Sequence, residues 1–215
     1  MIGILLAFTA GFVDTVGFVA LFGLFTAHVT GNFVLIGASL VQHRPGVIVK
    51  LLALPTFVLL VAATRLWVRH QERRGGGSKT ILLSTQILLL GCFLGAGMAA
   101  SPIVDPDAAW PIATGLLGVA AMAIQNAAAR LAFTDLAPTT VMTGNVTQAV
   151  IDAVDLLCGA ASDAIRARFA KMWPGVLAFA VGACGGGVAV ANIGFLCLLC
   201  PIVVLVVVIV RVRRD

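Results

Sequence analysis

Apolar runs separated by short polar breaks fill almost the whole chain, and they follow the same order in its two halves. Six of these runs approach or exceed the roughly 20 residues that a helix needs to cross about 30 Å of hydrocarbon. The expected spans are Ile2–Leu24, Val47–Val68, Thr80–Ala100, Trp110–Phe133, Trp173–Ala191 and Ile193–Val210. The pattern therefore predicts a helical membrane protein with about six transmembrane helices.

Two further apolar runs are too short to cross a bilayer. Gly31–Gln42 has about 12 residues and Val146–Gly159 about 14, or roughly 18 and 21 Å of helix. Each follows a polar break that contains glycine. We interpret both as half-helices of re-entrant hairpins, which enter the membrane and return to the same side. The polar segment Asp163–Lys171 is expected to be a connector between helices.

The tripeptide Thr-Gly-Asn occurs at both breaks, beginning at Thr30 and at Thr143. The region around Asp14 aligns with the region around Asn126 at a similar offset of about 112–113 residues. If each unit crosses the membrane three times, the second unit begins on the opposite side from the first. The two units then have opposite orientations, which is the pattern of an inverted repeat. We therefore expect one membrane domain, residues 1–215, made of repeat A (about 1–105) and repeat B (about 106–215).

The composition excludes an ordinary soluble fold. Hydrophobic residues make up 60% of the chain and charged residues 11%, with a mean hydropathy of +1.09, whereas soluble domains have about 45–50% apolar and about 25% charged residues. The apolar runs do not alternate as the ten-residue strands of an outer-membrane barrel do. The predicted fold class is an all-α integral membrane protein embedded in the lipid bilayer.

The net charge of +5 indicates a membrane topology and not a nucleic-acid partner. The basic residues cluster beside apolar segments, where they determine orientation. If the two half-helices are re-entrant, all of the 14 Lys and Arg residues except Arg44 and Lys50 fall on the side of the two termini. Because cytoplasmic loops carry an excess of basic residues, we expect both termini to be cytoplasmic and no binding of nucleic acid.

The sequence has no arrangement typical of an enzyme, a metal centre or a cofactor site. The five cysteines lie almost entirely within apolar runs, without His or carboxylate at ligand spacing, so we interpret them as small packing residues. Asp152 and Asp155 are the only paired carboxylates, and their i, i+3 spacing favours a solvated helix face. We expect no enzyme activity, no metal and no cofactor.

Two ionisable residues near the first break are candidates for a proton site. Asp14 lies about a dozen residues into a span, where a carboxylate costs several kcal/mol unless it is paired, hydrated or protonated. A hydrogen bond to a threonine or to the backbone of the break would explain it without any transport role. His28 could titrate near neutrality, although a lone histidine is more often a hydrogen-bonded structural group. Both interpretations stay open for each residue.

The polar residues of the two breaks form a second set of candidates. Each triplet opens a short helix, so its N–H groups and its Thr or Asn side chains lie at the positive end of a helix dipole. They can bind a polar or anionic solute there, or they can simply cap the helix. Gln125 and Asn126 take the place of Asp14 in repeat B. The candidate solute-binding residues are Asp14, Thr30, Gly31, Asn32, Gln125, Asn126, Thr143, Gly144 and Asn145.

Two motifs carry a resemblance to a known family. The stretch Gly11-Phe-Val-Asp-Thr-Val-Gly-Phe is followed by Phe25-Thr-Ala-His-Val-Thr-Gly-Asn, and Gln125-Asn126 and Thr143-Gly-Asn come later. Together they resemble the YoaK-like family of bacterial inner-membrane proteins, a domain of unknown function. The resemblance covers nearly the whole chain and implies a polytopic protein of the bacterial inner membrane with about six spans. It implies no particular substrate.

The expected function is passive or proton-coupled movement of a small polar or anionic solute. In transporters with inverted repeats the solute binds at the repeat interface near the midplane, where broken helices meet. One alternative is a channel for a small ion or solute, formed by a homodimer. Another is a membrane scaffold or assembly protein that transports nothing, in which the central polar residues would be buried without a water-filled cavity.

Overall fold

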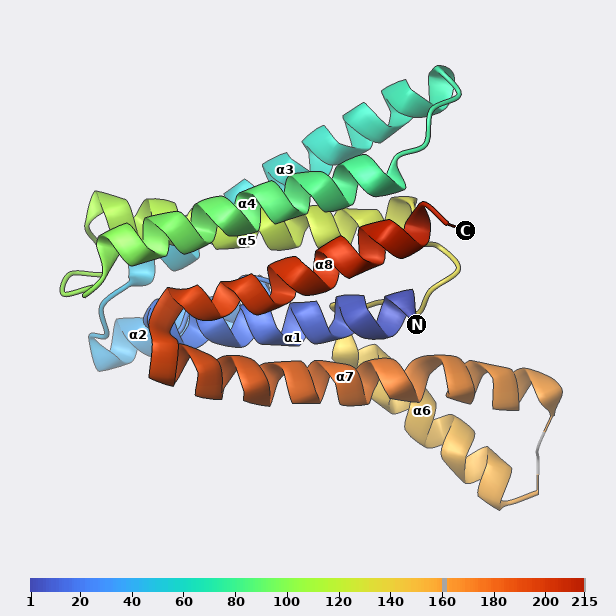
Figure 1. Ribbon diagram of the computed structural model, residues 1–215. Helices are drawn as coiled ribbons and strands as arrows, with labels where there is room; N and C mark the ends of the chain where they lie inside the picture. Colours follow the sequence, from blue (N-terminus) through green and yellow to red (C-terminus); the bar gives the residue numbers. More distant parts are fainter. Residues whose placement is uncertain (160–161, 215) are drawn as a thin grey trace.

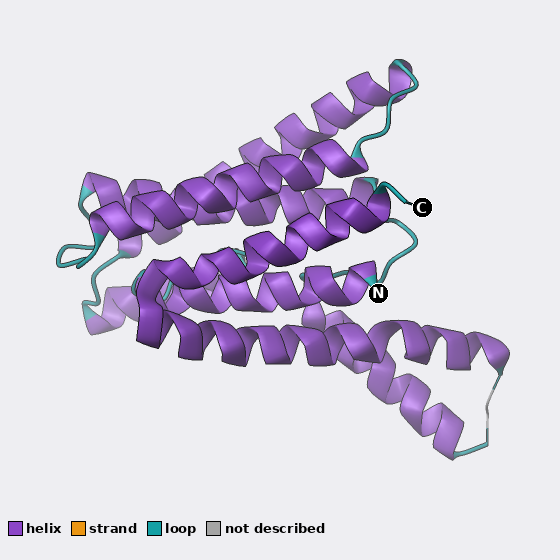
Figure 2. Cartoon of the chain, viewed as in Figure 1, coloured by secondary structure: helices purple, strands orange, loops and turns teal. Residues whose placement is uncertain are grey.

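The computed structural model describes residues 1–159 and 162–214, and in this part of the chain helices and loops occur without any strand (Figure 2). The all-α fold class predicted from the hydrophobic pattern is thus confirmed. The helices are α1 (Ile2–Ala20), α2 (Gly31–Gln42), α3 (Val47–Arg73), α4 (Lys79–Ala100), α5 (Ala109–Leu131), α6 (Met142–Leu157), α7 (Asp163–Ile193) and α8 (Leu199–Val212), with a short 3₁₀ helix, η1 (Gly194–Leu198), between the last two.

Five helical segments of the described chain are long and apolar enough to cross a membrane. Four of them are α1, α3, α4 and α5, and the fifth is the 50-residue stretch Asp163–Val212. This stretch contains both α7 and α8, which run antiparallel in Figure 1. The reversal begins at Gly194, whose φ of +57° ends α7. The shorter apolar helix α2 has the bounds that the sequence predicted.

The first span ends earlier than expected, at Ala20 rather than at Leu24. Phe22 and Gly23 adopt φ values of +53° and +84°, which a right-handed helix cannot contain. The chain turns here, and the N–H of Gly23 donates to the carbonyl of Phe18 at 2.9 Å. The first break is therefore longer than the sequence suggested, and it returns along α1.

The prediction that Asp163–Lys171 is a connector between helices is wrong, because this segment forms the first turns of α7. The hydroxyl oxygen of Ser162 accepts a hydrogen bond from the N–H of Ile165 at 3.3 Å, which caps the helix. Asp163 places a negative charge in the first turn, where it stabilises the helix dipole. Local polarity indicated a loop, but the cap and the dipole extend the helix. In the other short helix, α6 begins at Met142 rather than at Val146.

The two halves of the chain build their cores from each other's helices. α1 packs against α7 and α8, whereas α5 packs against α3 and α4. Within each half, the short helix contacts the long helix that follows it, α2 against α3 and α6 against α7. Exchanging the first four helices with the last four leaves this set of contacts unchanged. Figure 1 also shows that α1, α3 and α4 run opposite to α5, α7 and α8, respectively.

Burial falls from the centre of the bundle to its outer helices. In the apolar part of α1 and α5, 56% and 67% of residues are buried, compared with 22% in α3. Large apolar side chains such as Leu59, Leu66, Val181, Val188 and Val203 are exposed on the outside. Monomeric soluble proteins do not expose apolar surface on this scale, so the outer helices are suited to contact with lipid.

Three glycines let α1 and α7 approach until their backbones touch. A Cβ atom on Gly182 would lie 2.2 Å from the carbonyl oxygen of Phe8, and one on Gly186 would lie 2.5 Å from that of Phe12. From the other side, a Cβ atom on Gly11 would lie 2.2 Å from a backbone oxygen of α7. Small residues at helix interfaces have this role in membranes, where van der Waals packing drives association.

The two ends of the bundle differ in the segments that they contain. Both termini and the α3–α4 connection lie at one end in Figure 1, and α6 points toward this end from the bundle. The α4–α5 connection and α2 lie at the opposite end. Arg73 ends α3, Arg74 lies in the α3–α4 connection and Lys79 begins α4, while the last turns of the chain carry Arg211, Arg213 and Arg214. We call the end with the termini the basic end.

Candidate functional site

The first break is folded around the carboxylate of Asp14, which is 4% exposed. Its Oδ1 accepts hydrogen bonds from the backbone N–H groups of Thr26 at 2.8 Å and Ala27 at 2.7 Å. Its Oδ2 lies 2.7 Å from Nδ1 of His28. Asp14 is thus paired and hydrogen-bonded at the break, and its carboxylate satisfies two backbone N–H groups of the break that belong to no helix.

His28 connects the first break to the other half of the chain. Its side chain is 35% exposed, whereas that of Asp14 is 6% exposed. The imidazole ring stands edge-on to the ring of Phe179 in α7, with centroids 5.5 Å apart. The site therefore combines a hydrogen bond between a carboxylate and an imidazole with a contact between the two halves.

The second break has the same design with neutral groups. The hydroxyl of Thr140 donates to Oδ1 of Asn126, across the same 14-residue separation that joins Asp14 to His28. Its neighbour Gln125 is 1% exposed and belongs to a buried chain of amides. Nε2 of Gln125 donates to the carbonyl of Leu6 at 2.8 Å, and its Oε1 accepts from Nε2 of Gln86 at 2.6 Å. This chain links α4 and α5 to α1.

The asparagines of the two Thr-Gly-Asn triplets fasten the breaks to the short helices. Asn32 forms two hydrogen bonds of 2.9 Å with the backbone of Phe25, accepting from its N–H and donating to its carbonyl. Asn145 donates to the carbonyl of Pro138 at 2.6 Å. Both pairs are seven residues apart, and both asparagines are buried. Their side chains are therefore used by the fold itself.

The other residues of the triplets lie nearer the surface. Thr30 and Thr143 are exposed, as is Gly144, and a Cβ atom on Gly144 would meet nothing within 4 Å. Gly31 is partly buried beneath the ring of Phe25, and a Cβ atom on Gly31 would lie 2.9 Å from that ring. The triplets thus place a buried asparagine beside an exposed threonine, and their role in binding a solute stays a prediction.

A cavity of about 380 Å³ opens beside the second break. Asn126 and Thr140 line it together with Arg65 of α3 and Arg130 at the end of α5, and the remaining lining is mostly apolar, with Phe57, Val61 and Leu131 among it. Small-molecule sites are of this size and combine apolar walls with a few polar groups.

Five cavities in residues 1–159 and 162–214 lie away from the centre of the first break. None of them is lined by Asp14, Asn32 or Asn145. The two halves thus differ, since the first has a carboxylate–imidazole pair that borders none of these cavities, whereas the second has a cavity beside the neutral groups of Asn126 and Thr140. Among the predicted site residues, Asn126 is the one that lines this cavity.

Sequence reasoning missed three of the residues that line this cavity. It used Arg65 and Arg130 only as topology determinants, and it gave Thr140 no role. The 14-residue spacing from Asn126 to Thr140, which repeats the spacing from Asp14 to His28, was the available signal. No sequence signal brings Arg65 to the second break, because only the packing of α3 against α5 does so.

In the described part of the chain, no three His, Cys, Asp or Glu side chains come together in a group that could hold a metal ion. The cysteines in this part are free, with Cys197 buried and the others exposed. Cys197 has the buried position expected of a packing residue, whereas the other four do not pack inside the bundle.

The fold and the candidate site define a class of protein, an apolar helical protein with helices of membrane length and polar breaks between them. Within this class the chain belongs to the family described as "Protein of unknown function (DUF1275)", whose sequence model matches residues 2–211. This match confirms the resemblance to the YoaK-like family. No curated protein and no solved structure matches the chain.

Proposed function

We propose that this chain is a membrane transporter for a small anionic solute, built as an inverted repeat with six membrane crossings. The interchangeable contacts of the two halves and their opposite helix directions support the repeat. The antiparallel course of α7 and α8 supports the sixth crossing. The 14 residues of α8 reach membrane length together with the five residues of η1, since the two add up to roughly 31 Å. The short helices α2 and α6 supply the broken segments that such transporters place around a solute.

The proposed location is the inner membrane of a bacterium, with both termini in the cytoplasm. The location follows from the family resemblance, and the orientation follows from the basic end, because cytoplasmic segments carry an excess of Lys and Arg. Thiol labelling of single cysteines placed at Gly76, Asp107 and Arg213 tests it. Labelling of Gly76 and Arg213 from the inside and of Asp107 from the outside is expected, and labelling of all three from one side contradicts the topology.

The cavity at the second break is the observation that carries the proposal. Two guanidinium groups attract an anion and can bind it through paired hydrogen bonds, while Asn126 and Thr140 offer polar contacts at the inner wall. Nη1 of Arg65 lies 3.4 Å from Oε1 of Glu72, and both side chains are about half exposed. Exposed pairs of this kind contribute little stability, so a solute anion can compete for Arg65.

Asp14 and His28 are the proposed coupling pair. Uptake or loss of one proton changes the net charge of this pair by one in apolar surroundings, where electrostatic effects are strong. The pair also holds the first break against α1 and touches α7 through Phe179. A change in protonation therefore alters the contact between the two halves, which is the movement that alternating access requires.

The first test is a search for the solute with the purified protein. Thermal stability is measured with chloride, phosphate, sulfate, short carboxylates and amino acids, since a ligand at 100 times its Kd stabilises by about 2.7 kcal/mol. We expect at least one anion to raise Tm, and Arg130→Gln and Asn126→Ala to abolish the shift. Arg69→Gln is the matched control, because Arg69 is exposed on α3 and does not line the cavity.

The second test measures flux of that anion into proteoliposomes. We expect pH-dependent flux that Asp14→Asn slows and uncouples from protons, and a smaller effect of Asn32→Ala on the closed break. Flux without pH dependence would indicate a channel instead of a coupled carrier. Unchanged flux in both variants would remove these residues from the mechanism, and a panel without any stabilising or transported anion would reject the anion transporter.

The buried, hydrogen-bonded side chains of Asp14, Asn32 and Asn145 favour one other candidate, a membrane scaffold or assembly protein without transport. In that case the polar breaks shape the surface of the bundle and bind no solute. Cross-linking in native membranes that recovers one stoichiometric partner, together with no anion effect on Tm, would support the scaffold. Anion-dependent stabilisation that requires Arg130 would argue against it.

A further inference from the structure

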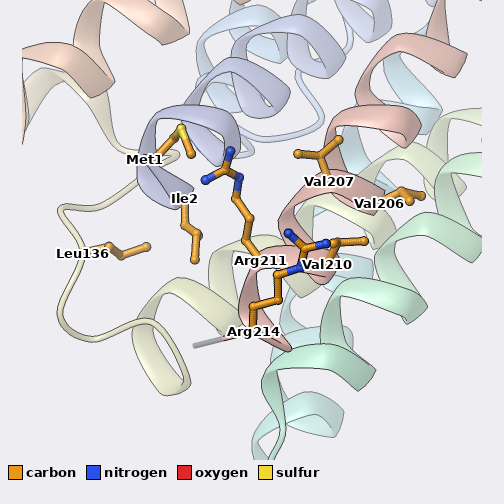
Figure 3. Close-up of a pocket in the computed structure, with 8 residues that line it drawn as sticks. All are labelled: Met1, Ile2, Leu136, Val206, Val207, Val210, Arg211 and Arg214. Carbon is orange, nitrogen blue, oxygen red and sulfur yellow. The ribbon is translucent and has the colours of Figure 1, made fainter.

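A second cavity, of about 550 Å³, lies at the basic end where the first turn of α1 meets the last turns of α8 (Figure 3). Val206, Val207 and Val210 of α8 line it. Ile2 of α1 and Leu136 of the second break also line it. This cavity is separate from the one proposed for the solute, and it lies on the boundary between the two halves of the chain.

Two guanidinium groups border this apolar cavity. Arg211 reaches from α8 toward the first turn of α1, and Arg214 lies beside Val210 (Figure 3). Neither forms an ion pair with another residue among 1–159 and 162–214. By contrast, Arg168 in α7 is paired with Asp152. The cavity thus joins an aliphatic wall to two cations that have no carboxylate partner in the described chain.

The opposite end of α1 provides an internal comparison. A cavity of about 340 Å³ there is lined by apolar residues such as Val19, Phe22 and Ile103 together with Ser101, and no basic residue borders it. Apolar hollows thus occur at both ends of the bundle, but arginines flank the cavity of the basic end. This charge difference determines which molecule fits the site.

We propose that this cavity binds an anionic phospholipid from the leaflet at the basic end. The phosphate of the headgroup lies between Arg211 and Arg214, since arginine recognises phosphate through paired hydrogen bonds. An acyl chain follows the valine surface of α8 toward the membrane interior. Basic pockets between membrane helices on the cytoplasmic side recognise lipids with these features. The lipid joins α1 of one half to α8 of the other.

The binding test uses the full chain in detergent with phosphatidylglycerol, phosphatidylcholine or inorganic phosphate, read by native mass spectrometry and by Tm. We expect phosphatidylglycerol to bind and to raise Tm, whereas phosphatidylcholine and phosphate do not. In Arg211→Gln/Arg214→Gln, binding of phosphatidylglycerol is expected to weaken about tenfold or more, as befits the loss of two charge-assisted contacts. Arg213→Gln is the matched control, because this arginine is exposed on the same turn and does not line the cavity.

A second variant separates lipid binding from folding. Val207→Trp fills the aliphatic wall without changing charge, and we expect it to weaken binding of phosphatidylglycerol while Tm without lipid stays unchanged. Equal binding of phosphatidylcholine, or wild-type binding by both the double arginine variant and Val207→Trp, overturns the proposal. An equal rise of Tm with inorganic phosphate also overturns it and points to a soluble anion. Binding of lipid here is independent of any transport result.

Discussion

Replacing Gly182 with alanine tests how closely α1 and α7 pack. The added Cβ atom would lie 2.2 Å from the carbonyl oxygen of Phe8, where real Cβ atoms essentially never come closer than 3.0 Å to another heavy atom. The obstacle is helix backbone and not a flexible side chain, so it cannot move aside by rotating. The two helices must separate by about 1 Å, which forfeits a quarter to a half of the attraction of each affected atom pair.

The expected cost follows from two opposing effects. Overpacking of this kind costs typically about 1–3 kcal/mol, and the upper part of this range applies because backbone meets backbone. Alanine in place of glycine stabilises a helix by about 1 kcal/mol through its higher helix propensity, which offsets part of this cost. The net destabilisation is about 2 kcal/mol, which corresponds to a decrease in Tm of about 4–8 °C for a chain of this size.

The chain offers a matched control three residues further along the same helix. A Cβ atom on Gly185 would lie 3.9 Å from the ring of Phe12, an ordinary van der Waals contact. Gly185→Ala should therefore keep Tm unchanged or raise it by a few degrees. The assay is thermal unfolding of each variant in the same detergent, followed by tryptophan fluorescence. If Gly182→Ala is as stable as Gly185→Ala, the tight contact between α1 and α7 does not exist as described.

Three further predictions concern the polar breaks and α6. Asp14→Ala leaves two buried N–H groups without an acceptor and should lower the free energy of unfolding by about 2–6 kcal/mol. Asp14→Asn keeps an oxygen at this place and should lower it clearly less. Equal decreases in Tm for the two variants would contradict this role of the carboxylate. Asn145→Ala should destabilise the protein by about 1–2 kcal/mol, because it removes the hydrogen bond between α6 and the break. Thr143→Ala, on the exposed side, should change the stability by no more than about 0.5 kcal/mol. Thermal unfolding distinguishes the two variants. Arg168→Gln should lower Tm more than the double variant Arg168→Gln/Asp152→Asn, because the single change leaves the buried carboxylate of Asp152 without its cation. Additive effects of the two substitutions on stability would show that the pair is not coupled.

Much of the fold could be predicted from the sequence because membrane helices have a strong local signal. A run of apolar residues must satisfy its backbone hydrogen bonds internally, so the long apolar helices and the short helix Gly31–Gln42 were predictable from composition alone. The errors fall where polarity and helix formation disagree. Asp163–Lys171 is polar but capped and helical, and Phe22 is apolar but stands in a left-handed turn.

The candidate site was predicted in part, for a related reason. Asp14, Asn32 and Asn145 stand out because polar groups are costly inside apolar segments, and each is buried and hydrogen-bonded. Their partners are mostly backbone atoms of the adjoining break, after Asp14 but before Asn32 and Asn145, and no residue pattern identifies these atoms in advance. Arg65 was counted only as a topology determinant, because its place beside Asn126 depends on the packing of α3 against α5.

The sequence by itself determined that the chain is helical and apolar, where its polar breaks lie, and that one motif recurs in both halves. Those properties depend on residues close together in the chain, whose hydrophobicity and backbone hydrogen bonding are local. Only the tertiary structure decided that each half packs its first helix between helices of the other half, and that the asparagines close the breaks. Those outcomes depend on contacts between residues far apart in the chain, such as Gly182 with Phe8 and Gln125 with Leu6, which exist only after the helices have packed.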